Sequence, residues 1–218
     1  NLRCKYCFTN SPKGDHVKEY LDYKAIANLA DQADELGYFE FDLQGGELLL
    51  QPDKLFKVLE AIRPERFYMY LTTNGYHLDE AMAKKLAEAN VSRVSVSIDS
   101  MDEKIHDEIR GKKDSWRRAM EGLKHVKKHG MDPYLNITVG HYNAHTEHLK
   151  QLLDYSKDQK YKTLLNVAVP AGTGLVGELV GHADSNQVTH TNDVAITTDD
   201  GSGISASTSI GDMTLSGT

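Results

Sequence analysis

Two cysteines stand three positions apart near the start of the chain, as Cys4-Lys5-Tyr6-Cys7, and they are the only cysteines among the 218 residues. Two cysteines cannot build a disulfide scaffold, so this close pair is better interpreted as a metal or redox site in a reducing compartment. Thiolates at this spacing can share a metal ion. The spacing alone leaves a redox dithiol and a half zinc site open.

Polar residues with chemical capability recur at the ends of the apolar segments further along the chain. They are Gln44-Gly45-Gly46-Glu47, Thr72-Thr73-Asn74-Gly75, Ser97-Ile98-Asp99 and Asn136. If the apolar segments are parallel strands, the polar groups collect at one edge of a sheet, where such folds bind ligands. Ser95, Ser97 and Asp99 alternate with apolar residues and are expected to face the interior, where a polar row indicates a polar ligand.

The elements that must position these groups follow from hydrophobic periodicity. Helices are expected over residues 24–36, 55–62, 79–89, 116–126 and 145–157, and strands over residues 39–43, 67–71, 94–98, 134–139 and 163–169. Asp22 is placed to cap the first helix and Ser115 the fourth. This alternation predicts an α/β fold of βα units with a parallel sheet and with the helices on one side.

Taken together and in order, these motifs resemble the radical S-adenosylmethionine (radical SAM) superfamily. The resemblance rests on the cysteine pair followed by Phe8, then Gly45-Gly46-Glu47, Thr73-Asn74-Gly75, Ser97-Ile98-Asp99, His106-Asp107 and Arg110-Gly111, and it runs from Asn1 to about residue 172. It implies a partial (β/α) barrel of the radical SAM type that lacks its first strand. The family motif CxxxCxxC would place its first cysteine immediately before Asn1, so the chain is expected to be truncated within that motif.

The resemblance also implies cofactors and the residues that hold them. Cys4 and Cys7 match the second and third ligands of a [4Fe–4S] cluster, whose remaining iron binds the amino and carboxylate groups of S-adenosylmethionine (SAM). Glu47 would then accept hydrogen bonds from the SAM ammonium group. Gly45 and Gly46 would let the backbone approach the ligand closely. Arg110 would hold the SAM carboxylate.

The nucleoside part of SAM has its own expected contacts under the same resemblance. Ser97 and Asp99 would bind the ribose or the carboxylate, and Asn136 the ribose or the adenine. Tyr6 would pack on the adenine ring, and Val169 would flank it. Leu48 stands where the family often has a proline, which is a mild departure.

The implied activity is reductive cleavage of SAM to a 5′-deoxyadenosyl radical that abstracts a hydrogen from the substrate. The pattern around His106 is most similar to members that modify peptides or build cofactors. The expected partners are a peptide or small-molecule substrate and a one-electron reductant such as a flavodoxin or ferredoxin. The alternatives are an inactive fragment, a non-catalytic nucleotide-binding α/β remnant, and a zinc or dithiol protein that uses Cys4 and Cys7.

Composition excludes several other classes of protein. The formal charge of −7 argues against a general nucleic-acid or membrane-surface binder. No apolar run approaches the roughly 18 residues of a membrane span, and no secretory signal is visible, so a cytoplasmic location is expected. His141, His145 and His148 have helical spacing, but a helix packed on the barrel exterior is favoured over a metal site. Lys124, Lys127 and Lys128 are expected to form a solvated helix face.

The composition of the chain changes sharply in its last quarter. All 25 Lys and Arg residues and every aromatic residue lie within residues 1–162, whereas residues 163–218 hold six acidic residues. Residues 185–218 are rich in Ser, Thr and Gly, and they do not resemble the family. The expected domains are therefore a radical SAM core over residues 1–174 and an acidic tail, either β-prone or disordered, over residues 175–218.

Deletion of residues 185–218 is expected to leave the thermal midpoint of the remaining chain nearly unchanged. The tail has little apolar area to offset an ordering cost of about 1–2 kcal/mol per residue. The check is calorimetry of the two chains, together with limited proteolysis by an enzyme that does not require Lys, Arg or aromatic residues. A midpoint lowered by more than a few degrees, or a tail that resists cleavage, would show that the tail belongs to the core domain.

Overall fold

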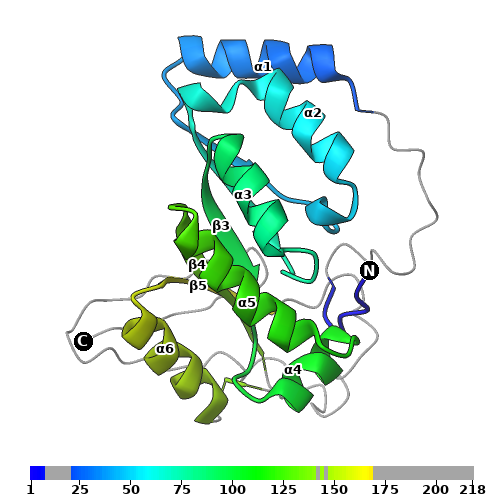
Figure 1. Ribbon diagram of the computed structural model, residues 1–218, viewed down its shortest axis with the longest axis vertical. Helices are drawn as coiled ribbons and strands as arrows, with labels where there is room; N and C mark the ends of the chain where they lie inside the picture. Colours follow the sequence, from blue (N-terminus) through cyan, green and yellow to red (C-terminus); the bar gives the residue numbers. More distant parts are fainter. Residues whose placement is uncertain (8–20, 141–142, 145–146, 169–218) are drawn as a thin grey trace, which may run out of the picture.

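The computed structural model describes residues 1–7, 21–140, 143–144 and 147–168, and its five strands form one parallel sheet in the order β1-β2-β3-β4-β5 (Figure 1). The strands are β1 (Glu40–Leu43), β2 (Tyr68–Thr73), β3 (Val91–Ser97), β4 (Asp132–Val139) and β5 (Lys162–Val167). The helices are α1 (Tyr23–Glu35), α2 (Pro52–Ile62), α3 (Glu80–Glu88), α4 (Glu103–Arg110), α5 (Ser115–Lys128) and α6 (Glu147–Gln159), with short 3₁₀ turns η1 (Leu48–Leu50) and η2 (Pro64–Arg66). The predicted α/β class and the partial (β/α) barrel are confirmed.

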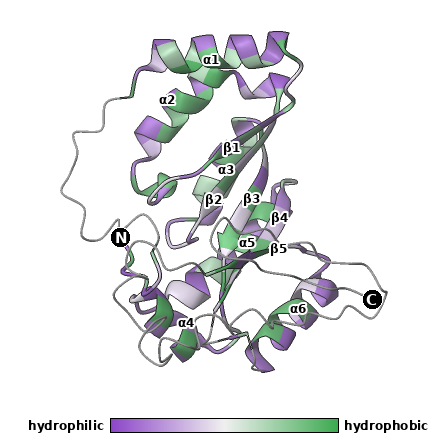
Figure 2. Cartoon of the chain, turned by 180° about the vertical axis from the view of Figure 1, so that it is seen from behind, coloured by the Kyte–Doolittle hydropathy of each residue, from purple (hydrophilic) through white to green (hydrophobic). Residues whose placement is uncertain are grey.

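The helices lie against one face of the sheet, so the other face is the concave inside of the partial barrel. Figure 1 views the helical side, and Figure 2 views the molecule from behind, where the strands face the reader. The core lies between the two layers. Its fully buried members come from strands and helices alike: Leu59, Ile62, Met69, Leu71, Leu86, Val94, Val96, Leu123, Leu135, Ile137 and Leu152.

Alternation along the strands sorts side chains between these two faces, as a two-residue period requires. On β2, Met69 and Leu71 are buried against the helices, whereas Tyr68 and Tyr70 on the other face are only half-buried.

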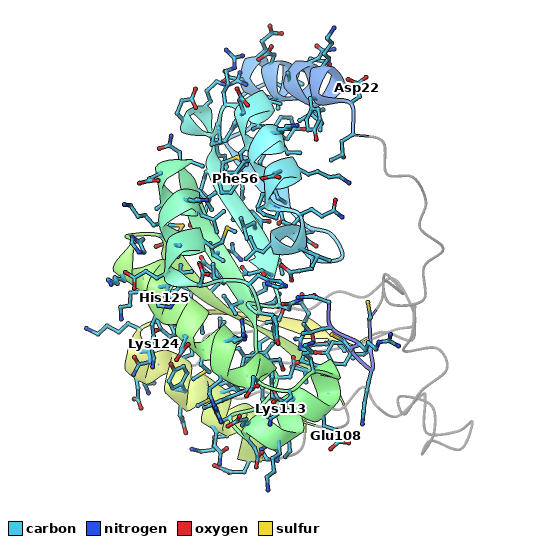
Figure 3. All side chains as sticks on the ribbon, turned by 45° about the vertical axis from the view of Figure 1, so that its right-hand side comes forward. Asp22, Phe56, Glu108, Lys113, Lys124 and His125 are labelled. Atoms are coloured by element: carbon cyan, nitrogen blue, oxygen red, sulfur yellow. The ribbon has the colours of Figure 1, made fainter. Side chains whose placement is uncertain are left out.

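The predicted solvated helix face is confirmed on α5, where Lys124, Lys127 and Lys128 are exposed. Figure 3 shows Lys124 and His125 projecting outward from this helix.

Most predicted elements are present within a few residues of their expected ends, and the capping residues explain why. The Asp22 carboxylate accepts hydrogen bonds from the amides of Lys24 and Ala25, as an N-cap should. The structure differs from expectation at two points. Helix α4 was not predicted. Ser115 does not cap α5: Asp114 is the N-cap residue, while the Ser115 hydroxyl donates to Asp107 Oδ1 at 2.7 Å.

The segment that carries the cysteines is seated on the C-terminal end of α4. The amide of Arg3 donates to the carbonyl of Arg110 at 3.1 Å, and the amide of Lys5 donates to the carbonyl of Ile109 at 3.0 Å. These carbonyls belong to the last turn of a helix, which has no partners of its own for them. Gly111 ends the helix with φ +63°, and a Cβ there would lie 2.5 Å from the carbonyl oxygen of Arg3.

Some expectations fall outside the described residues. They include the proposed domain boundary at residue 174, the tail over 175–218, Val169, and two of the three helically spaced histidines, His141 and His145. Within the described residues, none of the helices is long and apolar enough to span a membrane.

Gly111→Ala is expected to lower the free energy of unfolding by more than Gly130→Ala does. Both glycines have positive φ, so both substitutions carry a backbone cost of about 1 kcal/mol or more. A Cβ at Gly130 meets nothing within 4 Å, whereas one at Gly111 collides with the Arg3 backbone. Urea unfolding measures the free energy of unfolding of the two variants, and hydrogen exchange measures the protection of the Arg3 amide. Equal losses of free energy in both variants, with unchanged protection of the Arg3 amide, would contradict the proposed packing of the cysteine segment on α4.

Candidate functional site

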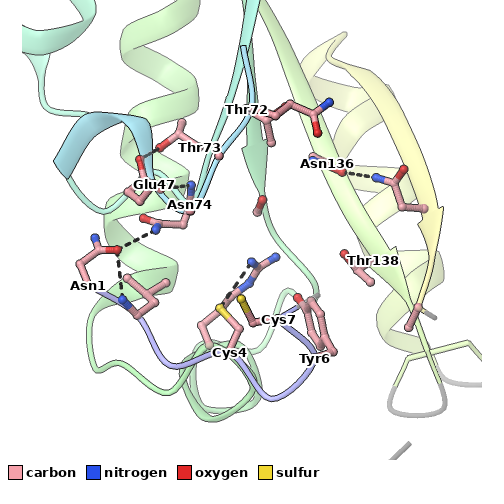
Figure 4. Close-up of a pocket in the computed structure, with 18 of the residues that line it drawn as sticks. Asn1, Cys4, Tyr6, Cys7, Glu47, Thr72, Thr73, Asn74, Asn136 and Thr138 are labelled. Carbon is pink, nitrogen blue, oxygen red and sulfur yellow. Dashed lines mark hydrogen bonds between the residues drawn. The ribbon is translucent and has the colours of Figure 1, made fainter. Parts of the chain in front are cut away.

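A cavity of about 380 Å³ opens at the C-terminal edge of the sheet, beside the cysteine segment (Figure 4). A volume of this size is within the range of small-molecule sites. The lining comes from the cysteine segment, the ends of all five strands, and α4. It includes Cys4, Tyr6, Cys7, Gln44, Gly45, Gly46, Glu47, Thr72, Thr73, Asn74, Ser97, Arg110, Asn136, Thr138, Leu164, Asn166 and Val167.

Both thiols belong to this lining, from one short turn in which the Cys7 amide bonds to the Cys4 carbonyl at 3.4 Å. Burial raises the pKa of the Cys4 thiol above its usual value, because a thiolate loses solvation there. The Arg110 guanidinium opposes this effect, with its Nη1 3.9 Å from Cys4 Sγ. The site therefore places a positive charge beside one of its two thiols.

The Asp99 carboxylate, just beyond the end of β3, holds this arrangement in place. It is fully buried, and its Oδ2 lies 2.7 Å from both Nε and Nη2 of Arg110. The same carboxylate accepts the Tyr6 hydroxyl and, through Oδ1, the Thr138 amide at 3.1 Å. Burial of a carboxylate is costly unless it has such charged and hydrogen-bonded partners. Asp99 thus joins the cysteine segment, α4 and β4 behind the cavity wall.

His106 lies behind Asp99 and completes its surroundings. The imidazole is fully buried, and its Nδ1 accepts the backbone amide of Asp99 at 3.3 Å, which assigns the proton to Nε2. Burial, assisted by the nearby Arg110 charge, lowers its pKa to about 4. The ring is therefore neutral at neutral pH. Its role is to orient the end of β3 from outside the cavity.

Asp107 has a separate structural role on the same helix. Burial by itself would raise its pKa, but hydrogen bonds from the Trp116 amide, the Ser115 hydroxyl and the Asp114 amide outweigh it and lower the pKa. Its Oδ1 accepts the Trp116 amide at 2.9 Å and its Oδ2 the Asp114 amide at 2.7 Å. Asp107 therefore joins α4 to the start of α5 and does not enter the cavity lining.

Glu47 faces the cavity from the opposite side, where it caps η1. Its Oε1 accepts the Leu49 amide at 3.1 Å and the Thr73 hydroxyl at 2.7 Å, and its Oε2 accepts the Asn74 amide at 2.8 Å (Figure 4). The Gly45-Gly46 turn before it and the Thr73-Asn74 turn thus form one unit. A carboxylate offers about four acceptor positions, so three donors leave Glu47 with capacity for one more.

The far wall of the cavity is built from alternating residues of β4 and β5. Asn136 Oδ1 accepts the Asn166 side-chain amide at 2.6 Å, and Thr138 follows on the same face of β4. Thr138 and Asn166 were not predicted. Their two-residue spacing from Asn136 and Leu164 was the signal in the sequence that could have found them.

Most of the predicted ligand residues are brought together by the fold. Those that line the cavity are Cys4, Tyr6, Cys7, Gly45, Gly46, Glu47, Ser97, Arg110 and Asn136. Asp99 is not part of that lining: its carboxylate is fully buried and bonded to Arg110, Tyr6 and Thr138, and its expected contact with ribose or carboxylate stays a prediction. Among the three helically spaced histidines, His148 is described, and its Nδ1 lies 3.5 Å from Ser100 Oγ.

The donors in the cavity fit an iron–sulfur cluster in part. Two thiols converge there, and sulfur is the donor type that such clusters and zinc select. Within the described ranges, no group of three or more His, Cys, Asp or Glu side chains is arranged to hold a metal ion. The described residues therefore offer two candidate sulfur donors.

Comparison with known proteins identifies the family. The model of the radical SAM superfamily matches residues 1–156. Relatives include a GTP 3′,8-cyclase of Nautilia profundicola, 35% identical over 162 residues that cover 73% of this chain and 50% of that protein. A GTP 3′,8-cyclase of Rippkaea orientalis is 32% identical and covers 64% of this chain and 44% of that protein. The chain thus spans half or less of the length of these relatives.

Solved structures show the same fold at low sequence identity. Streptococcus suis SuiB bound to the precursor peptide SuiA has a TM-score of 0.65 at 19% identity, covering 78% of this chain and 37% of that one. Methylornithine synthase (PylB) has a TM-score of 0.67 at 15% identity, covering 89% of this chain and 58% of that one. With the cysteine pair, the glycine turn and Arg110 gathered at one cavity, and with the family model matching 156 residues, this chain belongs to the radical SAM superfamily.

Proposed function

We propose that this chain is the core of an enzyme that binds a [4Fe–4S] cluster and SAM in the cavity described above. The observation that carries the proposal is the convergence of two thiols, the Gly45-Gly46-Glu47 turn and Arg110 on one cavity. Cys4 and Cys7 would hold the cluster, which would supply the electron for reductive cleavage of SAM to a 5′-deoxyadenosyl radical, and that radical would abstract a substrate hydrogen.

The chain's own residues are suited to hold SAM between two charged sites. Glu47 retains acceptor capacity for the ammonium group, and the two glycines before it have no side chains that could obstruct the approach. On the other side, Arg110 brings five N–H donors to the cavity wall, which a carboxylate can share with Asp99. Glu47 and Arg110 thus offer one negative and one positive charge on opposite sides of the cavity. These charges are complementary to the ammonium and carboxylate groups in the amino-acid part of SAM.

The nucleoside end of SAM is assigned to the far wall. Ser97 and Asn136 offer a hydroxyl and an amide to the ribose or adenine, and the Tyr6 ring, held through its hydroxyl by Asp99, offers a face for adenine. Val169 remains a proposed neighbour of the same ring. Asp99 acts through Arg110 and Tyr6 as a positioning residue.

The proposed substrate is a peptide or a small molecule of cofactor biosynthesis. Support comes from two kinds of relative: enzymes whose names describe cyclisation of GTP, and a protein of the same fold bound to a precursor peptide. A one-electron reductant, of the flavodoxin or ferredoxin kind, would complete the reaction. The alternative function, a zinc or dithiol protein, uses the same two thiols and is separated from the proposal by metal content.

A chain extended by one cysteine immediately before Asn1 is expected to hold about four iron atoms after anaerobic reconstitution, because the cluster needs a third thiolate. The matched control is the same extension with alanine, which should hold iron poorly. Iron, sulfide and zinc contents are measured together. Equal iron in both chains would refute the ligand assignment, and zinc in place of iron would favour the alternative function.

In the cysteine-extended, reconstituted protein, Glu47→Gln and Arg110→Gln are each expected to weaken SAM binding by about 1.5–3 kcal/mol, or roughly 10- to 150-fold. Calorimetric titration measures the affinity. Arg117→Gln is the control, because Arg117 is exposed and paired with Glu103. The double variant Asp99→Asn/Arg110→Gln guards against unfolding caused by an unpaired buried charge. Affinity unchanged in all of these variants would return Glu47 and Arg110 to purely structural roles.

A further inference from the structure

A half-buried arginine lies on the concave face of the sheet, deeper than the cavity. Arg93 is on β3, four residues before Ser97 of the cavity lining. Its guanidinium carbon lies 3.5 Å from the ring centroid of Tyr134 and 4.4 Å from that of Tyr70. Contacts between a guanidinium and aromatic faces are favourable, and two of them restrict its position. We call these three residues, Tyr70, Arg93 and Tyr134, the arginine clamp.

The Arg93 side chain leans toward the cavity. Its Nε donates to Ser95 Oγ at 3.3 Å, and Ser95 is one step closer than Arg93 to the C-terminal end of β3. Residues two apart on a strand are about 6.6 Å apart, so the guanidinium lies roughly one such step below Ser97. None of the three clamp residues belongs to the cavity lining, but the clamp lies on the same concave face, below the edge that carries the thiols, Glu47 and Arg110. We call this part of the face the floor.

Among the residues that the structure describes, no carboxylate forms an ion pair with Arg93. Asp132 is its register partner on β4, and the Tyr68 hydrogen bond and, more weakly, the charges of Lys162 and Arg93 lower the pKa of Asp132. The neighbouring acids are engaged by other donors. Asp132 Oδ2 accepts the Tyr68 hydroxyl at 2.7 Å and lies 3.4 Å from Lys162 Nζ. Asp42 accepts the side-chain amide of Gln44. Burial and the nearby Asp42 carboxylate raise the pKa of the Tyr70 hydroxyl. A half-buried guanidinium whose terminal nitrogens lack an anion suits a planar oxyanion, which it can bind through two parallel hydrogen bonds.

The surrounding charges disfavour a multiply charged anion. Arg93 and Lys162 share this face with Asp42, Asp132 and Glu40, which acts on Tyr70. A polyphosphate would add several negative charges to a surface without surplus cations, whereas a carboxylate adds one. We propose that the arginine clamp binds a carboxylate of the substrate, either an acidic peptide side chain or a small organic acid. The inference rests on the proposed function, which leaves the floor to the substrate.

The test uses the 218-residue chain with ¹⁵N-labelled arginine and follows the Nε–H resonance of Arg93, identified by its loss in Arg93→Gln. The probes are acetyl-Glu-amide, its neutral counterpart acetyl-Gln-amide, acetate and inorganic phosphate at one ionic strength. We expect a saturable shift with acetyl-Glu-amide and none with acetyl-Gln-amide. Acetyl-Glu-amide binding tighter than acetate would indicate a peptide source, and equal binding a small acid.

Matched variants give the proposal its control. Arg118 is also placed over a ring, 4.4 Å from the centroid of Tyr76, but it is exposed on α5. Arg118→Gln should leave the titration unchanged, whereas Tyr134→Leu, which keeps Arg93 and removes a ring, should weaken binding by about tenfold. If Tyr134→Leu unfolds, Arg93→Lys, which keeps the charge and loses the two-bond geometry, is expected to weaken it similarly.

Three outcomes would overturn the proposal: no saturable shift at Arg93, an equal shift at Arg118, or stronger binding of phosphate than of the carboxylates. The titration needs neither cluster nor SAM. Failure here would therefore leave the proposed function untouched, and failure of cluster or SAM binding with an intact titration would refute that function alone.

Discussion

The ion pair between Asp99 and Arg110 holds the site together. One buried carboxylate accepts donors from three places: α4 through Arg110, the cysteine segment through Tyr6, and β4 through Thr138. Loss of either charge would leave the other buried without compensation, which typically costs several kcal/mol. The position of both the thiols and the guanidinium therefore depends on a residue that does not itself line the cavity.

The cysteine segment illustrates how a short, nearly structureless stretch can be placed accurately. It has no helix or strand of its own, so its order comes from the two carbonyls at the end of α4 and from the Asp99 contact. Gly111 permits this approach by ending α4 in a left-handed conformation and leaving room for Arg3. The same helix thus ends, seats the segment and supplies Arg110, which ties the electrostatics of Cys4 to the fold.

The concave face of the sheet carries different side chains at the C-terminal edge of the strands than further along them. At the C-terminal edge it carries amides, hydroxyls and the two charged residues Glu47 and Arg110, while further down it carries tyrosines around Arg93. A parallel sheet whose helices all cover one face leaves such a surface along the full length of its strands. The two levels of this face therefore differ in chemistry: polar and charged groups at the edge, and aromatic rings around one guanidinium below.

The sequence by itself determined the order of all strands and of every helix but α4, and it located most of the residues that line the cavity. Periodicity of two and of 3.6 located strands and helices, and residues that follow a parallel strand must meet at one edge, so the pattern alone was enough to group Glu47, Ser97 and Asn136. Helix α4 was missed because its eight residues carry just two large apolar side chains, Ile105 and Ile109, which are too few to show a helical period. Only the tertiary structure decided that Asp99 pairs with Arg110 and that Arg93 lies between two tyrosines. Such contacts join residues from different elements, and no local sequence pattern encodes how those elements are placed relative to one another.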